Sequence, residues 1–170
     1  MIEIPADNRI LFYKRDRENF GFLSHFHPGT IVVDGENWPT VEHFYQAQKS
    51  PIMAYRNAIR AAEHPGHVKR LSASPLGKAR LTKGSWFTKN GKSWREDWQV
   101  VRLDLMRRGD QAKYTQNPDL AALLLATGDA DLIEDADNDA FWGIGKDGLG
   151  LNWAGRILME IRESLHSRAG

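Results

Sequence analysis

Residues 31–49, IVVDGENWPTVEHFYQAQK, carry the signals for a strand pair and a helix in direct succession. The apolar start predicts a strand, and the Asp34-Gly35 pair is typical of a hairpin turn that leads into a second strand ending at Trp38. Thr40 is a suitable N-cap, because its hydroxyl can accept a hydrogen bond from a backbone N–H of the first helical turn. We therefore expect a β-hairpin followed by a helix from Thr40 to about Ser50.

Weaker patterns on either side of this stretch predict the remaining elements. Short strands are expected over Ile10–Tyr13 and Leu132–Glu134. Helices are expected over Ile52–Glu63, Trp94–Arg108, Asp119–Ala126 and Trp153–Leu165. Residues 66–93 indicate a helix followed by loops, and residues 135–152 indicate a glycine-rich loop. Because no repeat or linker divides the chain, one domain is expected over residues 1–170.

The composition limits the classes of protein that the chain can belong to. It has 170 residues, with 23 Lys plus Arg against 22 Asp plus Glu, so its net charge is +1. That balance argues against a strongly charge-driven nucleic-acid or membrane binder, although it leaves room for a local basic cleft. The absence of cysteine excludes disulfides, thiolate catalysis and Cys-based zinc sites. Since no apolar run is long enough for a signal peptide or a membrane span, a cytoplasmic enzyme or binding domain is expected.

The sequence around Asp139 and Trp142 is the most unusual local pattern, because glycine recurs at positions 143, 145, 148 and 150. Glycines let a backbone approach a ligand closely, and Trp142 could stack on a flat base. The aspartates at positions 135, 137 and 139 are candidate acids. The spacing matches neither the P-loop nor the dinucleotide-binding fingerprint. A surface turn with solvated aspartates is an equally good interpretation.

Glu42, Gln46 and Lys49 fall at positions i, i+4 and i+7 of the expected helix, on one face. They could line a ligand site, although a solvated face is the more usual interpretation of such a stripe on an isolated helix. Trp94 and Trp98 share the i, i+4 spacing and are more often core residues than a stacking platform. The histidines at positions 25, 27 and 43 show no zinc-binding spacing, so no metal site is expected.

Taken together, the segments resemble the NADAR family, also called YbiA-like N-glycosidases, over most of the chain and in the same order. The matching motifs are FY at 12–13, FLSHF at 22–26, the stretch 31–49, Trp98 with Met106, KYTQNP at 113–118 with Thr127-Gly128, and residues 132–162 with their Asp, Trp-Gly, glycine and Asn positions. The resemblance implies a compact α+β fold, mainly helical with a few short strands. The family's usual Asn in the turn motif is His25 here, a change that bears on specificity because a neutral imidazole cannot donate and accept in the same geometry as an amide.

The resemblance also implies an enzyme that cleaves the N-glycosidic bond between a ribose C1′ and a base-like nitrogen. Two substrate groups are attached to the family, namely phosphoribosylamino-pyrimidine intermediates of early riboflavin synthesis and ADP-ribose linked to guanine in nucleic acid. The resemblance makes Glu42 and Asp139 the candidate catalytic residues. The candidate substrate-binding residues are Trp98, Trp142, Lys49, Gly143, Gly145, Asn152 and His25. The scheme requires no cofactor and no metal.

Cleavage of the C1′–N bond develops positive charge on the ribose, which a nearby carboxylate stabilises while it orients an attacking water. Glu42 is the candidate for this role, and Asp139 would hold ribose hydroxyls or act as acid and base; the two assignments can be exchanged. Trp142 or Trp98 would stack on the base. Lys49 and the loop amides over residues 143–150 would bind phosphate.

The expected partner is a ribosylated small molecule or ADP-ribosylated DNA or RNA, and not a membrane. Basic residues near the middle of the chain would suit a nucleic-acid backbone, although a solvated surface explains them equally well. They are Lys69, Arg70, Lys78, Arg80, Lys83, Lys89, Lys92, Arg95, Arg107 and Arg108. The alternative from a different class is a non-catalytic module that binds ADP-ribose or NAD through the same residues.

Overall fold

The computed structural model describes residues 2–13, 19–74, 83–90 and 94–169. The chain divides into two compact units, which we call the terminal unit (Met1–Gly29 with Asp110–Gly170) and the central unit (Thr30–Gly109). The boundary between the units falls inside one helix, α6. Among the predicted basic residues, Lys78, Arg80 and Lys92 lie outside the described residues.

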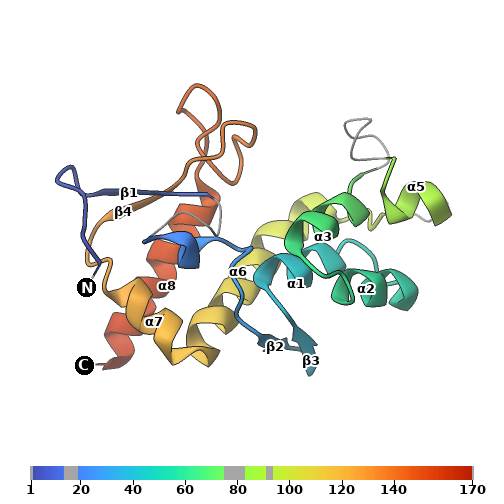
Figure 1. Cartoon of the computed structure of the whole chain (residues 1–170), viewed down its shortest axis with the longest axis horizontal. Coiled ribbons are helices and arrows are strands. Elements are labelled where there is room, and N and C mark those ends of the chain that lie inside the picture. The colour runs from blue at the N-terminus through green and yellow to red at the C-terminus, as the bar shows by residue number, and fades with distance from the viewer. Residues whose placement is uncertain (1, 14–18, 75–82, 91–93, 170) are drawn as a thin grey trace. The chain divides into compact units, whose positions relative to one another are not determined.

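The terminal unit is built on a parallel pair of strands from opposite ends of the chain. Its elements are β1 (Arg9–Phe12), η1 (Gly21–Leu23), the end of α6, α7 (Pro118–Leu125), β4 (Asp131–Glu134) and α8 (Trp153–Ala169). β1 pairs with β4 in a register that places Ile10 opposite Leu132. α8 packs against β4, and α7 packs against α8 (Figure 1). The buried apolar side chains include Ile10, Phe12, Leu23, Tyr114, Leu124, Leu132, Ile157 and Leu158.

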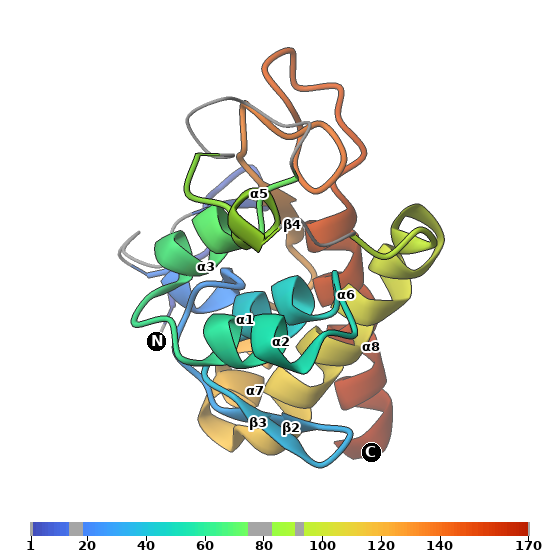
Figure 2. The same cartoon turned by 90° about the vertical axis from the view of Figure 1, so that its right-hand side faces the viewer.

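The central unit combines a β-hairpin with a group of short helices. Its elements are β2 (Ile31–Val33), β3 (Glu36–Trp38), α1 (Val41–Ala47), α2 (Met53–Arg60), α3 (Pro65–Leu71), α5 (Trp86–Asn90) and the first part of α6 (Trp98–Gln116). Asp34 and Gly35 join the antiparallel strands with φ values of 54° and 76°, the positive angles that a tight hairpin turn requires. α1 packs against β3, α2 and α3, and Figure 2 shows α1 beside α2.

Helix α6 differs from the predicted Trp94–Arg108 helix at both ends. It begins at Trp98, because Asp97 is the residue whose carbonyl accepts the first helical bond, from the amide of Val101 at 3.1 Å. It continues through Gly109, where a Cβ would approach side-chain atoms of Phe44 and Val41 at 3.0 Å. The glycine is thus required for close packing on α1 and does not end the helix.

The predicted fold class, α+β and mainly helical with a few short strands, is confirmed. The hairpin and the helix start at Thr40 are also confirmed, since the Thr40 hydroxyl accepts the His43 amide hydrogen at 3.2 Å. α1 ends at Ala47, earlier than predicted, and α8 continues to Ala169. The single domain stays a prediction. Within the described part of the chain, no helix combines the length and the apolar character needed to cross a membrane.

Candidate active site

Two polar side chains of α1 and one in the turn that follows it are buried rather than solvated. Glu42 is 5% exposed, Gln46 6% and Lys49 9%. The interpretation of this stripe as a solvated face is therefore wrong, because α1 is covered by β3, α2 and α3 and has no free side. A buried carboxylate and a buried amine are costly to keep in a fold, so such groups are candidates for function.

Glu42 is held in position from within its own helix. Its Oε1 accepts a hydrogen bond from Nε2 of Gln46 at 3.0 Å. It lies in the first turn of α1, where the partial positive charge of the helix start favours a carboxylate. The neighbouring hydroxyl of Tyr55 donates to the backbone carbonyl of Gln46 at 2.6 Å, and burial together with the charge of Glu42 raises the pKa of Tyr55.

His43, by contrast, is fully engaged by the fold. Its Nε2 donates to the carbonyl of Ala62 at 3.1 Å, so its Nδ1 accepts from the Thr40 hydroxyl at 2.8 Å. Burial lowers the pKa of His43, which agrees with this neutral form. Both ring nitrogens are occupied, and the described residues contain no group of three His, Asp or Glu side chains suited to a metal.

Lys49 lies over two tryptophan rings. Its Nζ is 4.5 Å from the ring centre of Trp94 and 5.4 Å from that of Trp98, distances at which a cation is attracted to an aromatic face. It also donates to the carbonyl of Ser72 at 3.3 Å. Burial lowers the pKa of Lys49 to about 8, and the charge of Glu42 opposes this shift. The amine therefore loses its proton at a lower pH than an ordinary lysine does.

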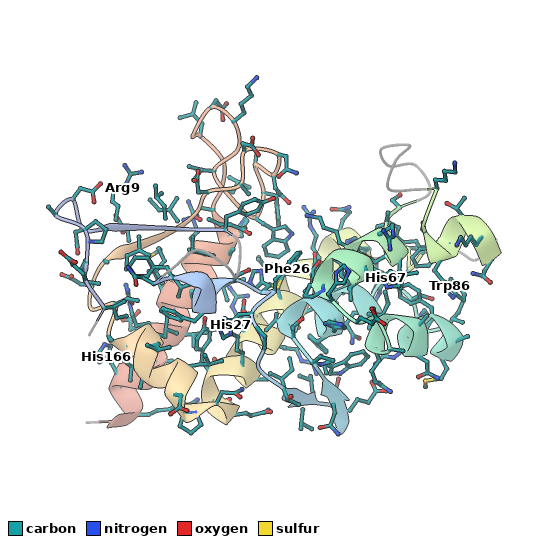
Figure 3. All side chains as sticks on the ribbon, in the orientation of Figure 1. Arg9, Phe26, His27, His67, Trp86 and His166 are labelled. Atoms are coloured by element: carbon teal, nitrogen blue, oxygen red, sulfur yellow. The ribbon has the colours of Figure 1, made fainter. Side chains whose placement is uncertain are left out.

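Trp98 belongs to an aromatic group and is 7% exposed. Its ring lies 4.9 Å from that of Tyr45 and 6.2 Å from that of Trp94, while Phe87 stacks on Trp94 at 5.6 Å. Trp86, labelled on α5 in Figure 3, extends the group through its contact with Phe87. The core interpretation of Trp98 fits this packing, and its ring still forms one wall beside Lys49.

In the terminal unit, the predicted site residues of the glycine-rich loop are organised by backbone hydrogen bonds. Oδ1 of Asp139 accepts from the amides of Phe141 and Trp142, both at 3.0 Å. A Cβ on Gly143 would collide with the carbonyl of Glu134, and Gly145 has a φ of 66°. Asp139 is half-buried, and none of the described residues bonds to its Oδ2. One carboxylate oxygen is therefore left for a ligand.

Asn152 at the end of this loop is committed to the strand beside it. Its Oδ1 accepts from the amide of Glu134 at 2.9 Å, and its Nδ2 donates to the carbonyl of Leu132 at 2.8 Å. Its φ of 50° lies in the left-handed region that Asn tolerates better than most residues. The side chain anchors the loop to β4 through these two bonds.

His25 forms a buried pair that the sequence did not reveal. Its Nε2 lies 3.0 Å from Oδ2 of Asp110, which is completely buried. Burial alone lowers the pKa of His25, but the charge and hydrogen bond of Asp110 outweigh burial and leave the pKa of His25 raised. Phe26 and His27, labelled in Figure 3, follow it. Unlike the amide of the family's usual Asn, the His25 side chain can gain a proton, and its pairing with Asp110 raises its pKa.

The structure brings the predicted residues together in two sets. In the central unit, Glu42 is bonded to Gln46, Lys49 lies over Trp94 and Trp98, and the charge of Glu42 acts on Lys49, so the predicted stripe and the tryptophan pair form one cluster. In the terminal unit, the loop residues Asp139, Trp142, Gly143, Gly145 and Asn152 form the second set, and His25 pairs with Asp110. The sequence did not indicate Asp110, because the helix was expected to end at Arg108, two residues before it. The i+4 spacing of Gln46 from Glu42 was the one signal available for Gln46.

Comparison with known proteins identifies the family. The family model described as NADAR domain matches residues 11–166. The chain belongs to the NADAR domain family. The N-glycosidase YbiA of Escherichia coli is 40% identical over 162 residues, which cover 95% of this chain and 91% of that protein. The solution NMR structure of E. coli YbiA matches with a TM-score of 0.79 and 36% identity, covering 99% of this chain and 91% of that one.

A riboflavin biosynthesis protein of Vibrio vulnificus is 42% identical over 161 residues. These cover 94% of this chain but 39% of the Vibrio protein, so the chain spans well under half the length of that relative. Relatives of nearly the same length are named N-glycosidases. The prediction of a NADAR-family enzyme that hydrolyses glycosidic bonds is thereby confirmed.

Proposed function

We propose that this NADAR domain hydrolyses the N-glycosidic bond of a phosphoribosylamino-pyrimidine, with Glu42 as the carboxylate beside C1′. The observation that supports it most is the burial of Glu42 in one cluster with Lys49 and Trp98. A carboxylate with little water around it acts more strongly on the charge that develops at C1′. Gln46 fixes one of its oxygens, which leaves the other for water or the sugar.

The proposed reaction adds one water across the bond. Water attacks C1′ as the C1′–N bond breaks, and the bonding electrons leave with the nitrogen. Glu42 accepts the proton of the attacking water, and a proton is returned to the leaving nitrogen. Lys49 supplies positive charge to an anionic group of the substrate, and Trp98 forms an apolar wall. Asp139 remains the second candidate acid.

The residues of the terminal unit are proposed as substrate contacts. Trp142 would offer a ring to the base, and Gly143 and Gly145 their amides to phosphate. Asp139 would hold a ribose hydroxyl through its second carboxylate oxygen. Asn152 would contribute indirectly, since its side chain supports the loop. His25 would contribute through its pairing with Asp110, which raises the pKa of His25.

The pyrimidine substrate is supported by the name of the Vibrio relative, a riboflavin biosynthesis protein. A second candidate is ADP-ribose linked to guanine in nucleic acid. It is favoured by the segment from His64 to Arg95, which contains no Asp or Glu. Among the described residues of this segment, the exposed cations are Lys69, Arg70, Lys83 and Lys89. Such a segment suits a phosphate backbone.

The test is to incubate the purified protein with the phosphoribosylamino-pyrimidine and, separately, with DNA ADP-ribosylated on guanine, and to follow the products by mass spectrometry. Ribose 5-phosphate released from the first supports the proposal. Release of ADP-ribose with restored guanine supports the second candidate instead. No product from either, together with tight ADP-ribose binding, would favour a non-catalytic binding module and refute both.

The Glu42→Gln variant tests the catalytic assignment. We expect its turnover to fall at least about a thousandfold while thermal unfolding stays close to wild type, because the amide keeps the shape but not the charge. The matched control is Glu63→Gln, at an exposed position of the same unit. Wild-type turnover in a folded Glu42→Gln protein would show that Glu42 is not the catalytic carboxylate.

A further inference from the structure

Gln46 lies on α1, four residues after Glu42 and three before Lys49 in the turn that follows the helix, and it is almost completely buried. Its Nε2 donates to Oε1 of Glu42 at 3.0 Å. Its backbone carbonyl accepts from the Tyr55 hydroxyl at 2.6 Å. The residue is therefore held at both its backbone and its side chain.

The orientation of the Gln46 amide follows from its partner. The Glu42 carboxylate offers only acceptors, so the NH2 group must face it and Oε1 of Gln46 must point elsewhere. This oxygen is buried and has no hydrogen-bond partner among the described residues. An unpaired buried acceptor destabilises a folded protein, so a ligand that brings a donor to it gains affinity.

A second unpaired group of the same cluster has the opposite polarity. Nε1 of Trp94 is buried, and within the described ranges no residue accepts its hydrogen. The Trp94 ring lies 4.5 Å from Nζ of Lys49, whose pKa responds to the charge of Glu42. The cluster therefore has an unused acceptor and an unused donor, which match a ligand that carries both hydroxyl and carbonyl groups.

We propose that Oε1 of Gln46 accepts a hydrogen bond from the 2′-hydroxyl of the substrate ribose and thereby selects ribose over 2′-deoxyribose. This inference rests on the proposed function, in which Glu42 lies beside C1′. The carbon that carries the 2′-hydroxyl is bonded directly to C1′, and Gln46 is one hydrogen bond away from Glu42. As C1′ gains positive charge, the 2′-hydroxyl becomes a better donor, so this bond strengthens in the transition state.

The selection has a chemical consequence for the choice of target. The N-glycosidic bonds of intact DNA join bases to 2′-deoxyribose, which lacks the hydroxyl that Gln46 would recognise. Phosphoribosyl and ADP-ribosyl groups both carry it. Gln46 would therefore direct hydrolysis toward ribosylated compounds and away from the ordinary nucleotides of DNA.

The test compares the phosphoribosylamino-pyrimidine with its 2′-deoxyribosyl analogue, using kcat/KM for wild type and Gln46→Met. We expect kcat/KM of wild type to be at least about tenfold higher for the ribosyl compound, because the deoxyribosyl analogue cannot form this one hydrogen bond. In Gln46→Met the preference should fall to about twofold or less. Gln46→Asn, which shortens the side chain but keeps the amide, should lose it as well and serves if the Met variant does not fold.

Gln48 provides the matched control on the same segment. Its amide is already paired, since Nε2 donates to the Phe44 carbonyl at 3.4 Å and Oε1 accepts from Arg56 at 3.1 Å. The Gln48→Met variant should therefore keep the ribose preference. A preference that persists in Gln46→Met, or that is lost equally in Gln48→Met, overturns the inference.

A binding measurement separates this inference from the proposed function. Ribose 5-phosphate and 2-deoxyribose 5-phosphate are titrated into the protein by calorimetry. Tighter binding of ribose 5-phosphate to wild type, lost in Gln46→Met, supports the role of Gln46 even if neither substrate is turned over. Equal binding of the two sugars to wild type refutes that role even if turnover is observed.

Discussion

Among the lysines that the structure describes, two are buried, one in each unit, and they differ in how their amines are used. Nζ of Lys113 donates to the carbonyls of Phe22 and Ser24 at 2.6 and 3.0 Å. Nζ of Lys49 forms one bond within the described part of the chain, of 3.3 Å to the Ser72 carbonyl, and it lies over two aromatic rings. Burial lowers the pKa of both to about 8.

The comparison shows that a shifted pKa does not by itself identify a functional group. Lys113 is a structural cation, because its two strong bonds hold η1 and Ser24, the residue after it. The Tyr114 hydroxyl also donates to the Phe22 carbonyl of η1, at 3.1 Å. Lys49 has one acceptor among the described residues, so its amine keeps unused hydrogen-bonding capacity, and the charge of Glu42 acts on its pKa. The difference lies in the partners, and four predictions test it.

The largest effect is expected from Lys113→Met. The substitution removes one donor from each of two buried carbonyls and a cation near Asp110, so we expect the free energy of unfolding to fall by about 3–5 kcal/mol. Urea denaturation at pH 7 measures it. Lys146→Met, at an exposed position of the same unit, should change it by less than about 0.5 kcal/mol. Equal effects of the two variants would show that Lys113 is not structural.

Lys49→Met should act mainly on turnover. We expect kcat/KM to fall about a hundredfold, equivalent to about 2.7 kcal/mol, because a charge beside the substrate is lost. The free energy of unfolding should change by less than about 1 kcal/mol, since a thioether packs well against tryptophan rings. Kinetics and urea denaturation are measured on the same preparation. A loss of stability as large as that of Lys113→Met would make Lys49 structural too.

The pH dependence of the free energy of unfolding tests the lowered pKa values of both lysines. Both amines have a folded-state pKa of about 8, below the ordinary 10.5, so the unfolded chain binds more protons between these values. Stability therefore rises with pH from about 8, by up to about 1.4 kcal/mol per pH unit for each lysine. Lys49→Met should remove about half of this rise.

The measurement for this third prediction is urea denaturation between pH 8 and 9.5. Higher pH is avoided because burial raises the pKa of Tyr55 and Tyr114, whose ionisation in the unfolded chain lowers stability above about pH 10. If the free energy of unfolding rises with pH equally steeply in wild type and in Lys49→Met, the pKa of Lys49 is not lowered in the folded state.

The smallest effect is expected at His25, which shares Asp110 with Lys113. Because the pKa of His25 is raised above 6.5 in the folded state, its stabilising contribution is present below pH 6.5 and is lost as pH rises through that raised pKa. His25→Asn should cost about 1 kcal/mol at pH 6 and less at pH 9, by urea denaturation. His166→Asn, at an exposed site, is the control. A loss that does not vary with pH would show that the imidazole is uncharged.

The sequence predicted α6 poorly and the hairpin well, for related reasons. Asp34-Gly35 requires no distant partner to form a turn, so its signal is local. Gly109, in contrast, is a helix breaker by propensity, and only the contact with Phe44 and Val41 explains why the helix continues. The candidate site shows the same division, since Glu42 was found from motif and spacing, whereas Asp110 lies in the part of α6 that was missed.

By itself the sequence determined the hairpin, the Thr40 cap, the glycine-rich loop and the family, because turns, caps and motifs depend on neighbours in the chain. Only the tertiary structure decided that the polar stripe of α1 is buried, that β1 pairs with β4 and that His25 meets Asp110. These facts depend on contacts between residues far apart in sequence. Burial in turn sets the pKa of Lys49 and leaves Oε1 of Gln46 unpaired, and both follow from what packs around α1.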